Sequence, residues 1–325
     1  MSRSLYYADA IREALRQCMQ EDGDVYIFGE DVALYGGVFG VTKDLFHEFG
    51  PKRVRNTPLS EGAILGEAIG AAVYGLRPVP EIQFSDFLTT AMSPLVDIMA
   101  TYHYRVGTKL PITIRAPSGG ALRIGHFHSK CLEAWFVHTP GLKVVVPSTA
   151  YDAKGLLVSS IRDNNPVLFL EQKKLYREIK DEVPEEIYDI PLGQAIIRTE
   201  GSHITLVTYG SPTYLALKAA ALLQKEGIEL EVIDLRTIYP FDKETLKKSF
   251  SKTNRVIILH EAVKIAGFGA ELAAFFAEEC FEYMAAPIMR LGALHTPIPT
   301  NPVLEDHYLP SLQDILDAAR GLMKY

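Results

Sequence analysis

Short apolar segments alternate with helix-length segments along almost the whole chain of 325 residues. The apolar segments are rich in valine and isoleucine, which is typical of strands buried on both faces of a parallel sheet. Such a sheet needs helices on its faces, so the pattern predicts an α/β fold. In the first half, the predicted strands are 25–31, 53–57, 78–84, 111–117, 142–148 and 166–171, and the predicted helices are 43–49, 61–75, 86–104 and 150–163.

A charged stretch interrupts this alternation. Its sequence, QKKLYREIKDEVPEEIYDIPLG, contains two prolines and is typical of a linker over residues 172–200. The length of the chain suggests two domains, and we place them at 1–185 and 195–325. In the second region, the predicted strands are 203–210, 229–236, 255–262 and 287–293, and the predicted helices are 213–226, 242–250, 268–280 and 312–323, the last one capped by Ser311.

The composition excludes several classes of protein. With 48% hydrophobic and 22% charged residues, the chain can bury proper cores and is not disordered. A net charge of −7 and the absence of long lysine and arginine runs argue against nucleic acid as the main partner. No uncharged apolar run reaches the ~18 residues that a membrane span needs.

The cysteines and the N-terminal sequence indicate a location inside the cell. The three cysteines, Cys18, Cys131 and Cys280, are odd in number and far apart, so we expect reduced thiols and no disulfide framework. The N-terminal residues carry acids at Asp9 and Glu13 within a helical apolar period, unlike a secretory signal. We therefore expect a bacterial-type cytoplasmic protein without a targeting peptide.

One acid at the start of a small-residue helix needs an explanation. In NTPLSEGAILGEAIGAAVYGLR (56–77), Glu61 begins the predicted helix. The simple explanation is that an acid stabilises a helix N-terminus, which Ser60 or Thr57 would also cap. The alternative is chemistry, because glycines at 62, 66 and 70 lie on one face and predict the close approach of another helix, another subunit or a flat ligand.

A second polar group follows the strand at 78–84. Gln83 closes this strand, Asp86 and Phe87 open the next helix, and Glu61 also lies just after a strand. In parallel sheets, ligands bind outside the carboxyl ends of strands. Glu61, Gln83 and Phe87 therefore predict a crevice for a flat heterocycle with hydrogen-bonding nitrogens.

The loop at 116–141 is the richest polar segment. His126, His128 and Cys131 would suit zinc, although no second pair of cysteine or histidine supports that spacing. A histidine here would also serve as a proton donor or acceptor at the edge of a site. A surface or packing role for the histidines remains open, and the surrounding glycines suit a mobile loop that forms part of a site.

Familiar nucleotide and hydrolase motifs are incomplete or missing. The segment GFGAEL (267–272) has Leu272 where a dinucleotide fingerprint needs its third glycine, so tight packing between loop and helix explains it better. The sequence contains neither G-x-x-x-x-G-K-[ST] nor G-x-S-x-G.

Several longer runs together carry a specific resemblance. They are FGEDVALYGGVFGVT, NTPLSEGAILG, RPVPEIQFSDF, HSKCLEAWFVHTPGLKVV, EVIDLRTIYPFD and HEAVKIAGFGAE. With them, the chain resembles beta subunits of the thiamine-diphosphate-dependent decarboxylating component of 2-oxo acid dehydrogenase complexes. The resemblance implies two parallel-sheet domains, a pyrimidine-binding domain and a transketolase C-terminal-like domain, in an α₂β₂ heterotetramer.

The resemblance also implies roles for particular residues. Glu61 would contact a ring nitrogen of the cofactor's aminopyrimidine and help to activate the cofactor, and a dry site would favour the neutral form of this carboxyl group. His128 would transfer a proton while the acyl group moves to lipoyl. The remaining implied residues are Leu59, Gln83 and Phe87 around the aminopyrimidine, and Ile112, Ser160, Ile161, Asp163 and Asn165 at a structural potassium site.

Two departures from the family pattern affect the expected chemistry. Lys130 adds a cation beside His128, where relatives often carry glutamine or aspartate. The G-D-G motif that holds Mg²⁺ and the diphosphate is missing, and the nearest string is EDGDVY (21–26). The resemblance therefore assigns Mg²⁺ and the diphosphate to an alpha subunit.

The expected reaction is oxidative decarboxylation of a 2-oxo acid, with acyl transfer to the lipoyl group of an acyltransferase core. A branched-chain substrate is favoured, and pyruvate or acetoin is the alternative. Two other classes remain open: a nucleotide-dependent oxidoreductase that uses the second domain, and a non-catalytic docking subunit. No nucleic acid or membrane partner is expected.

Overall fold

The predicted α/β alternation is present in a computed structural model of the protein, which describes residues 2–120 and 122–325. The chain divides into two compact units. The first contains the chain up to Ser118 together with Trp135–Leu192, and the second contains Gly119–Ala134 and Gly193–Tyr325. The segment that carries His128 thus belongs to the second unit, and the boundaries at 185 and 195 stay a prediction about domains.

The first unit is built on a parallel sheet. Its strands are β2 (Val25–Gly29), β3 (Val54–Asn56), β4 (Arg77–Glu81), β5 (Thr113–Ser118), β6 (Lys143–Val145) and β7 (Val167–Gln172). Their order is β6-β7-β5-β4-β2-β3, and the neighbours pair in parallel. Every residue of β2, β5 and β7 is buried, as the continuous apolar runs predict.

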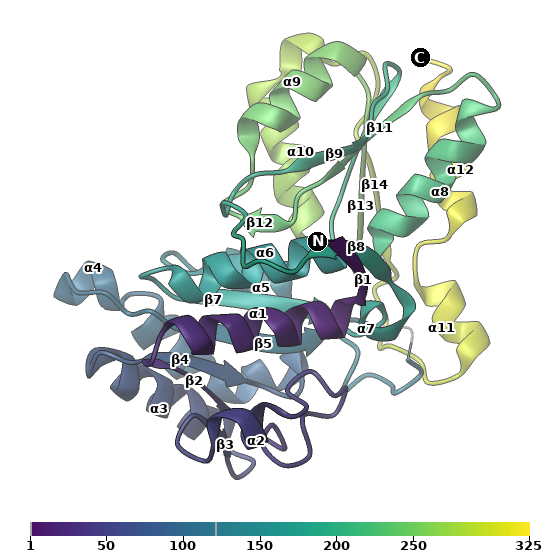
Figure 1. Cartoon of the computed structure of the whole chain (residues 1–325). Helices are drawn as coiled ribbons and strands as arrows, with labels where there is room; N and C mark the ends of the chain where they lie inside the picture. Colours follow the sequence, from purple (N-terminus) through teal and green to yellow (C-terminus); the bar gives the residue numbers. More distant parts are fainter. Residues whose placement is uncertain (1, 121) are drawn as a thin grey trace. The chain divides into compact units, whose positions relative to one another are not determined.

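Helices cover this sheet, and α1 packs against α6 (Figure 1). The helices are α1 (Tyr7–Glu21), α2 (Leu45–Phe49), α3 (Glu61–Val73), α4 (Tyr102–Val106), α6 (Ala150–Arg162) and α7 (Leu175–Glu178), with α5 (Glu133–Val137) at the boundary between the units. The single helix predicted at 86–104 is wrong. It is divided into η1 (Ser85–Ala91), η2 (Ser93–Met99) and α4. Pro94 explains the break between η1 and η2, because it cannot donate a backbone hydrogen bond and crowds the preceding turn.

The linker prediction for 172–200 is wrong for most of its length. Besides α7, this segment contains β8 (Lys180–Pro184), which pairs antiparallel with β1 (Ser2–Tyr6). The helical period predicted from Leu5 therefore begins only at Tyr7, because the preceding residues form β1.

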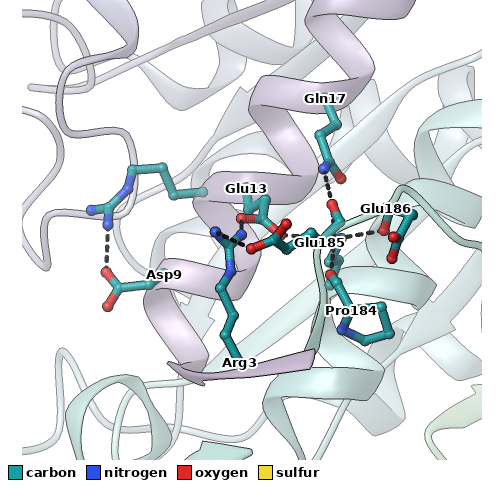
Figure 2. A network of polar contacts seen from close by, with 9 residues as sticks. Arg3, Asp9, Glu13, Gln17, Pro184, Glu185 and Glu186 are labelled. Carbon is teal, nitrogen blue, oxygen red and sulfur yellow. Dashed lines mark hydrogen bonds and ion pairs between the residues drawn. The ribbon is translucent and has the colours of Figure 1, made fainter. Parts of the chain in front are cut away.

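Side chains also fix this segment. Figure 2 shows Gln17 of α1 facing Glu185, whose carbonyl oxygen accepts a hydrogen bond from the Gln17 side chain at 2.7 Å. The buried ammonium group of Lys154 donates to Glu13 at 2.8 Å and to the carbonyl oxygen of Pro184 at 2.7 Å. The backbone carbonyl oxygens of Pro184 and Glu185 therefore bind this segment to side chains of α6 and α1.

The second unit has its own, mostly parallel sheet. Its order is β14-β13-β10-β11-β9, with β9 antiparallel to β11. Apolar side chains of β10, β11 and β13 form one core with α8 and α12, which pack against each other (Figure 1). The elements are β9 (Ile196–Thr199), β10 (Ile204–Thr208), α8 (Pro212–Gln224), β11 (Leu230–Asp234), β12 (Thr237–Tyr239), α9 (Lys243–Thr253), β13 (Val256–Val263), α10 (Phe268–Glu279), η3 (Phe281–Tyr283), β14 (Met289–Ala293), α11 (Pro302–Tyr308) and α12 (Leu312–Leu322).

Two local predictions for this unit are confirmed. Ser311 caps α12 in a capping box with Asp314. Gly267 and Gly269 at the start of α10 permit close packing, because a Cβ atom at Gly269 would lie 2.6 Å from Nε2 of the buried His260. Among the residues that the structure describes, no helix is both long and apolar enough to cross a membrane.

Candidate active site

Three parallel strands of the first unit end at the same edge of the sheet. Gly29, the last residue of β2, lies opposite Asn56 of β3 and Glu81 of β4. Only glycine fits at position 29, because a Cβ atom there would lie 2.5 Å from the carbonyl oxygen of Glu81. The segments that carry Glu61 and Gln83 therefore leave the same edge of the sheet on either side of β2, as expected for the carboxyl ends of parallel strands.

Glu61 is the first residue of α3 and is half-buried. Its Oε2 atom accepts a hydrogen bond from the hydroxyl of Thr90 at 2.8 Å. The predicted caps are wrong: Ser60 makes no capping hydrogen bond, and the buried hydroxyl of Thr57 has no partner among the described residues. Glu61 itself thus supplies the negative charge at this helix start, and Thr90 fixes its direction.

The other predicted residues lie close to the same edge. The buried Gln83 donates to the carbonyl oxygen of Glu30 at 3.0 Å and to Oε1 of Glu81 at 2.8 Å. Phe87 is half-buried on η1, and its carbonyl oxygen also lies 2.8 Å from the Thr90 hydroxyl. Thr90 thus joins Glu61 to the backbone of Phe87, whereas Gln83 is held separately by Glu30 and Glu81.

The site is open on one side within the described residues. The Leu59 side chain is 84% exposed, and Glu61 is not fully buried. The dry environment that we expected around Glu61 is therefore not supplied by this part of the chain alone.

Glu30 is a site residue that the sequence reasoning missed. It is buried, and its Oε1 atom has no hydrogen-bond partner among the described residues. Burial raises the pKa of Glu30 to about 7, and the charges of Glu61, Asp31 and Glu81 add to this effect. A carboxyl group with such a pKa exchanges protons readily near neutral pH. The available signal was an acid directly after the fully buried strand VYIFG.

A buried network of charged side chains is connected to Gln83 through Glu81. Arg115 donates to Glu81 at 2.6 Å and to both oxygens of Glu171 at 2.6 and 2.8 Å. Tyr176 donates to Glu171 at 2.6 Å. Burial alone would lower the pKa of Arg115, but the two carboxylates raise it, so the guanidinium stays charged. Because Glu81 also binds Gln83, this network positions the amide at the sheet edge.

We expect Arg115→Leu to destabilise the protein by about 3–5 kcal/mol, since two buried carboxylates lose their cation. Chemical denaturation would measure this loss. Arg320→Leu is the matched control, because Arg320 forms exposed ion pairs with Glu226 and Asp317, which are worth about 0–1 kcal/mol. A loss at Arg115 no larger than that at Arg320 would contradict the prediction.

His128 lies in a loop of the second unit. Its side chain is half-buried, and its backbone N–H donates to Gly125 at 3.2 Å. His126 and Phe127 are exposed, and their rings lie 4.1 Å apart. The ammonium group of Lys130 lies 5.8 Å from the Phe127 ring centre, which favours the cation there.

The zinc hypothesis for this loop gains no support. In the described ranges, no group of three or more His, Cys, Asp or Glu side chains is placed to hold a metal ion. Proton transfer and packing remain the alternatives for His128.

Most residues of the predicted potassium site lie around the turn after α6. The Arg77 guanidinium donates to the carbonyl oxygens of Ile161 at 3.0 Å and Asp163 at 3.1 Å. The carbonyl oxygen of Ser160 accepts the Asp163 N–H at 3.2 Å, and the Asn165 N–H donates to the Asp163 carboxylate at 2.8 Å. The carbonyl oxygen of the fifth predicted residue, Ile112, accepts the N–H of Val167 at 2.9 Å. Carbonyl oxygens are the ligand type that K⁺ prefers.

The glycine face of α3 is not in close contact with another part of the described chain. A Cβ atom at Gly62 would meet only Thr90, at 3.6 Å, and Cβ atoms at Gly66 and Gly70 would meet nothing within 4 Å. Packing against another helix of this chain is therefore not the reason for these glycines.

Comparisons with known proteins identify both halves of the chain. Residues 3–178 match the transketolase pyrimidine binding domain, and residues 193–315 match the transketolase C-terminal domain. Among solved structures, a split-gene transketolase described as an inactive beta4 tetramer has a TM-score of 0.79. It is 23% identical, with 98% of this chain and 99% of that chain covered. At this identity, the likeness shows the fold alone.

Curated relatives match over nearly the full length. The 2-oxoisovalerate dehydrogenase subunit beta of Bacillus subtilis is 44% identical, with 98% of both chains covered. The pyruvate dehydrogenase E1 component subunit beta of the same organism is 45% identical, with 97% of this chain and 98% of the relative covered. An acetoin:2,6-dichlorophenolindophenol oxidoreductase subunit beta, also from Bacillus subtilis, is 44% identical, with 99% and 98% covered. With its paired transketolase pyrimidine-binding and C-terminal domains, the chain belongs to the family of beta subunits of 2-oxo acid dehydrogenases.

Proposed function

We propose that this chain supplies the aminopyrimidine half of a thiamine diphosphate site. With an alpha subunit, it would oxidatively decarboxylate a 2-oxo acid and pass the acyl group to lipoyl. The observation that carries this proposal is Glu61, held by Thr90 at the edge where three parallel strands end.

The residues at this edge fit an aminopyrimidine ring. Phe87 offers an aromatic face, and Leu59 offers an apolar side chain that is exposed in this chain. The Gln83 amide is held by its contacts with Glu30 and Glu81. The orphaned Oε1 atom of buried Glu30 adds an unused acceptor beside Glu61. A ring with hydrogen-bonding nitrogens matches this mixture of apolar and polar groups.

Each residue then has a separate task. Glu61 would hold a proton at a ring nitrogen, Phe87 would stack on the ring, and Leu59 would exclude water from it. When bound, thiamine diphosphate supplies the reactive carbon and the electron sink for decarboxylation. Thr90 would keep the Glu61 carboxylate directed at the ring nitrogen.

His128 would move a proton during acyl transfer to lipoyl. A half-buried imidazole in a polar loop suits this task, because its two ring nitrogens can donate and accept protons. The acceptor would be a lipoyl group on the acyltransferase core of the complex.

The proposed alpha subunit would hold Mg²⁺ and the diphosphate. The relatives are named as beta subunits, and this sequence has no G-D-G motif of its own. The uncovered glycine face of α3 and the exposed Leu59 suit a partner chain in an α₂β₂ heterotetramer.

We expect the purified chain to show no turnover of 2-oxo acids when only thiamine diphosphate and Mg²⁺ are added. Half of the cofactor site would be missing, so binding and decarboxylation would both fail. The measurement is decarboxylation with an artificial electron acceptor, before and after addition of the alpha subunit. Turnover by the rigorously purified chain alone would show that the alpha subunit is not required.

The substrate remains open between three groups of relatives. The 2-oxoisovalerate, acetoin and pyruvate relatives are nearly equally similar to this chain. We favour a branched-chain 2-oxo acid because of the sequences of the segments at 173–193 and 260–271. Comparing kcat/KM for 2-oxoisovalerate and pyruvate in the reconstituted complex decides this point, and a preference for pyruvate would reject our choice.

We further propose that K⁺ binds near Ile161 and Asp163, and we expect it to raise the melting temperature. A ligand that binds only the folded state stabilises it by about 2.7 kcal/mol at 100 times its dissociation constant. The measurement is thermal melting in KCl compared with NaCl and choline chloride at equal ionic strength. Identical melting curves in all three salts would argue against a specific site.

A further inference from the structure

The loop that carries His128 is fixed at its start by two carboxylates of the second unit. The N–H of Gly120 donates to Oε1 of Glu261 at 2.5 Å, and the Ser211 hydroxyl donates to the other oxygen at 2.9 Å. A Cβ atom at Gly120 would lie 2.9 Å from a carboxylate oxygen of the buried Glu305. Glycine is therefore needed because the backbone lies directly on these groups.

The middle of the loop is fixed by an ion pair. Arg123 donates to Glu305 at 3.0 Å and to Asp306 at 2.6 Å, both on α11. It also donates to the carbonyl oxygen of Pro302 at 3.2 Å. One side chain of the loop thus binds three groups of a single helix.

The end of the loop is fixed by one buried hydrogen bond. The hydroxyl of Tyr209 donates to Oε1 of Glu133 at 2.8 Å, and both residues are buried. The Tyr209 ring is held by an edge contact with Phe268, with ring centres 6.1 Å apart, and it lies parallel to His260 at 6.3 Å. Burial raises the pKa of Glu133 to about 7, while the Tyr209 hydrogen bond opposes this rise.

Two of these anchors lie five positions from His128, Arg123 before it and Glu133 after it, and of the two only the Tyr209–Glu133 hydrogen bond joins two buried side chains. Glu133 follows His128 by only five positions and begins α5. A buried carboxyl group that loses one of its donors must find another partner or move, because an unsatisfied buried polar atom is costly. A shift of Glu133 would be passed to His128 through this short piece of backbone.

We infer that Tyr209 and Glu133 are positioning residues for His128, so that the C-terminal domain sets the geometry of acyl transfer. This inference rests on the proposed role of His128. Neither residue touches the reacting groups in this scheme. Their effect on the reaction passes through the loop.

The test is Tyr209→Phe in the reconstituted complex, which keeps the ring and removes only the hydroxyl. We expect acyl transfer, measured as overall NADH formation, to slow about tenfold, which corresponds to roughly 1.4 kcal/mol. Decarboxylation with an artificial acceptor should change much less. Amide hydrogen exchange should become faster in residues 122–132 and stay unchanged in β10 and β11. Tyr283→Phe, the same change at a tyrosine that is 42% exposed, is the matched control.

Two further variants keep the inference falsifiable. Glu133→Gln keeps the oxygen that accepts the Tyr209 hydrogen bond, so this variant should retain most of the acyl-transfer rate. A loss of acyl transfer in Glu133→Gln as large as the loss in Tyr209→Phe would overturn the inference. In a His128→Ala background, Tyr209→Phe should cause no additional loss. An additive loss would show that Tyr209 acts independently of His128 and would also overturn it.

The failure of the inference is distinguishable from the failure of the proposed function. If His128→Ala impairs transfer while Tyr209→Phe behaves like wild type, only the positioning role is wrong. If His128→Ala leaves transfer intact, the proposed role of His128 fails, and the positioning role fails with it.

Discussion

Glu61→Gln is expected to slow proton exchange at C2 of the bound cofactor by about 10²–10⁴, the usual contribution of general acid–base catalysis. Glutamine keeps the size of the side chain and can still accept the Thr90 hydrogen bond that holds Glu61 at 2.8 Å. It cannot deliver a proton to a ring nitrogen. The variant therefore tests the loss of proton transfer while the shape of the site is kept.

The same change should hardly affect folding. A charge at a helix N-terminus is worth about 0.3–1 kcal/mol. This is small beside a domain stability of roughly 5–15 kcal/mol. If Glu61 served only the helix start, the substitution would give this small loss of stability and near-normal activity.

The measurement is hydrogen–deuterium exchange at the cofactor C2 in the complex reconstituted with the alpha subunit, together with thermal melting. Glu67→Gln is the matched control, since Glu67 lies on the same helix and forms an exposed ion pair with Arg55. The control should keep wild-type exchange. Wild-type exchange in Glu61→Gln would return Glu61 to a purely structural role.

The sheets were predictable because their strands are buried on both faces. VYIFG and PVLFLE are short apolar runs without alternating polar residues, which is the pattern of a strand buried on both faces. The structure contains the buried strands β2 and β7 there. The β1–β8 pair was not predictable in this way. In β8, Val183 is the only fully buried residue, and charged residues dominate the strand. What orders this strand is pairing with a segment almost 180 positions away, together with the buried Lys154. Local composition carries no information about either.

The candidate site was predictable only in part, for a related reason. Glu61 and Gln83 stand out because each lies near the carboxyl end of a strand, and such ends meet at one edge of a parallel sheet. Thr90 lies 29 positions from Glu61 and Arg115 lies 34 positions from Glu81, and each matters only through its contact with that residue. Such partners become visible only when the register of the strands is known. Glu30 could have been predicted in the same way, because it follows the last residue of β2.

The loop around His128 shows the opposite limitation. Its glycines suggested mobility, but Gly120 lies against the carboxylates of Glu261 and Glu305. Glycine in a sequence signals either freedom or close contact, and only the neighbours distinguish the two. Here the neighbours are at least 141 positions away in the sequence.

His128→Ala is expected to lower overall NADH formation by about 10²–10³, within the range of a lost general acid or base. Decarboxylation with an artificial acceptor should fall much less, because the proposed proton transfer belongs to the later acyl-transfer step. Stability should change little, since the imidazole is only half-buried. His126→Ala is the matched control, because His126 lies two positions away in the same loop and is exposed.

Both rates are measured in the complex reconstituted with the alpha subunit and the lipoyl acyltransferase. Equal losses in the two assays would remove the step-specific role of His128, because a proton needed only for acyl transfer leaves the artificial-acceptor reaction untouched. An equal loss in His126→Ala would point to the loop as a whole instead of one imidazole. A selective loss at position 128 alone would assign the proton to His128, since the two variants delete the same side chain from the same loop.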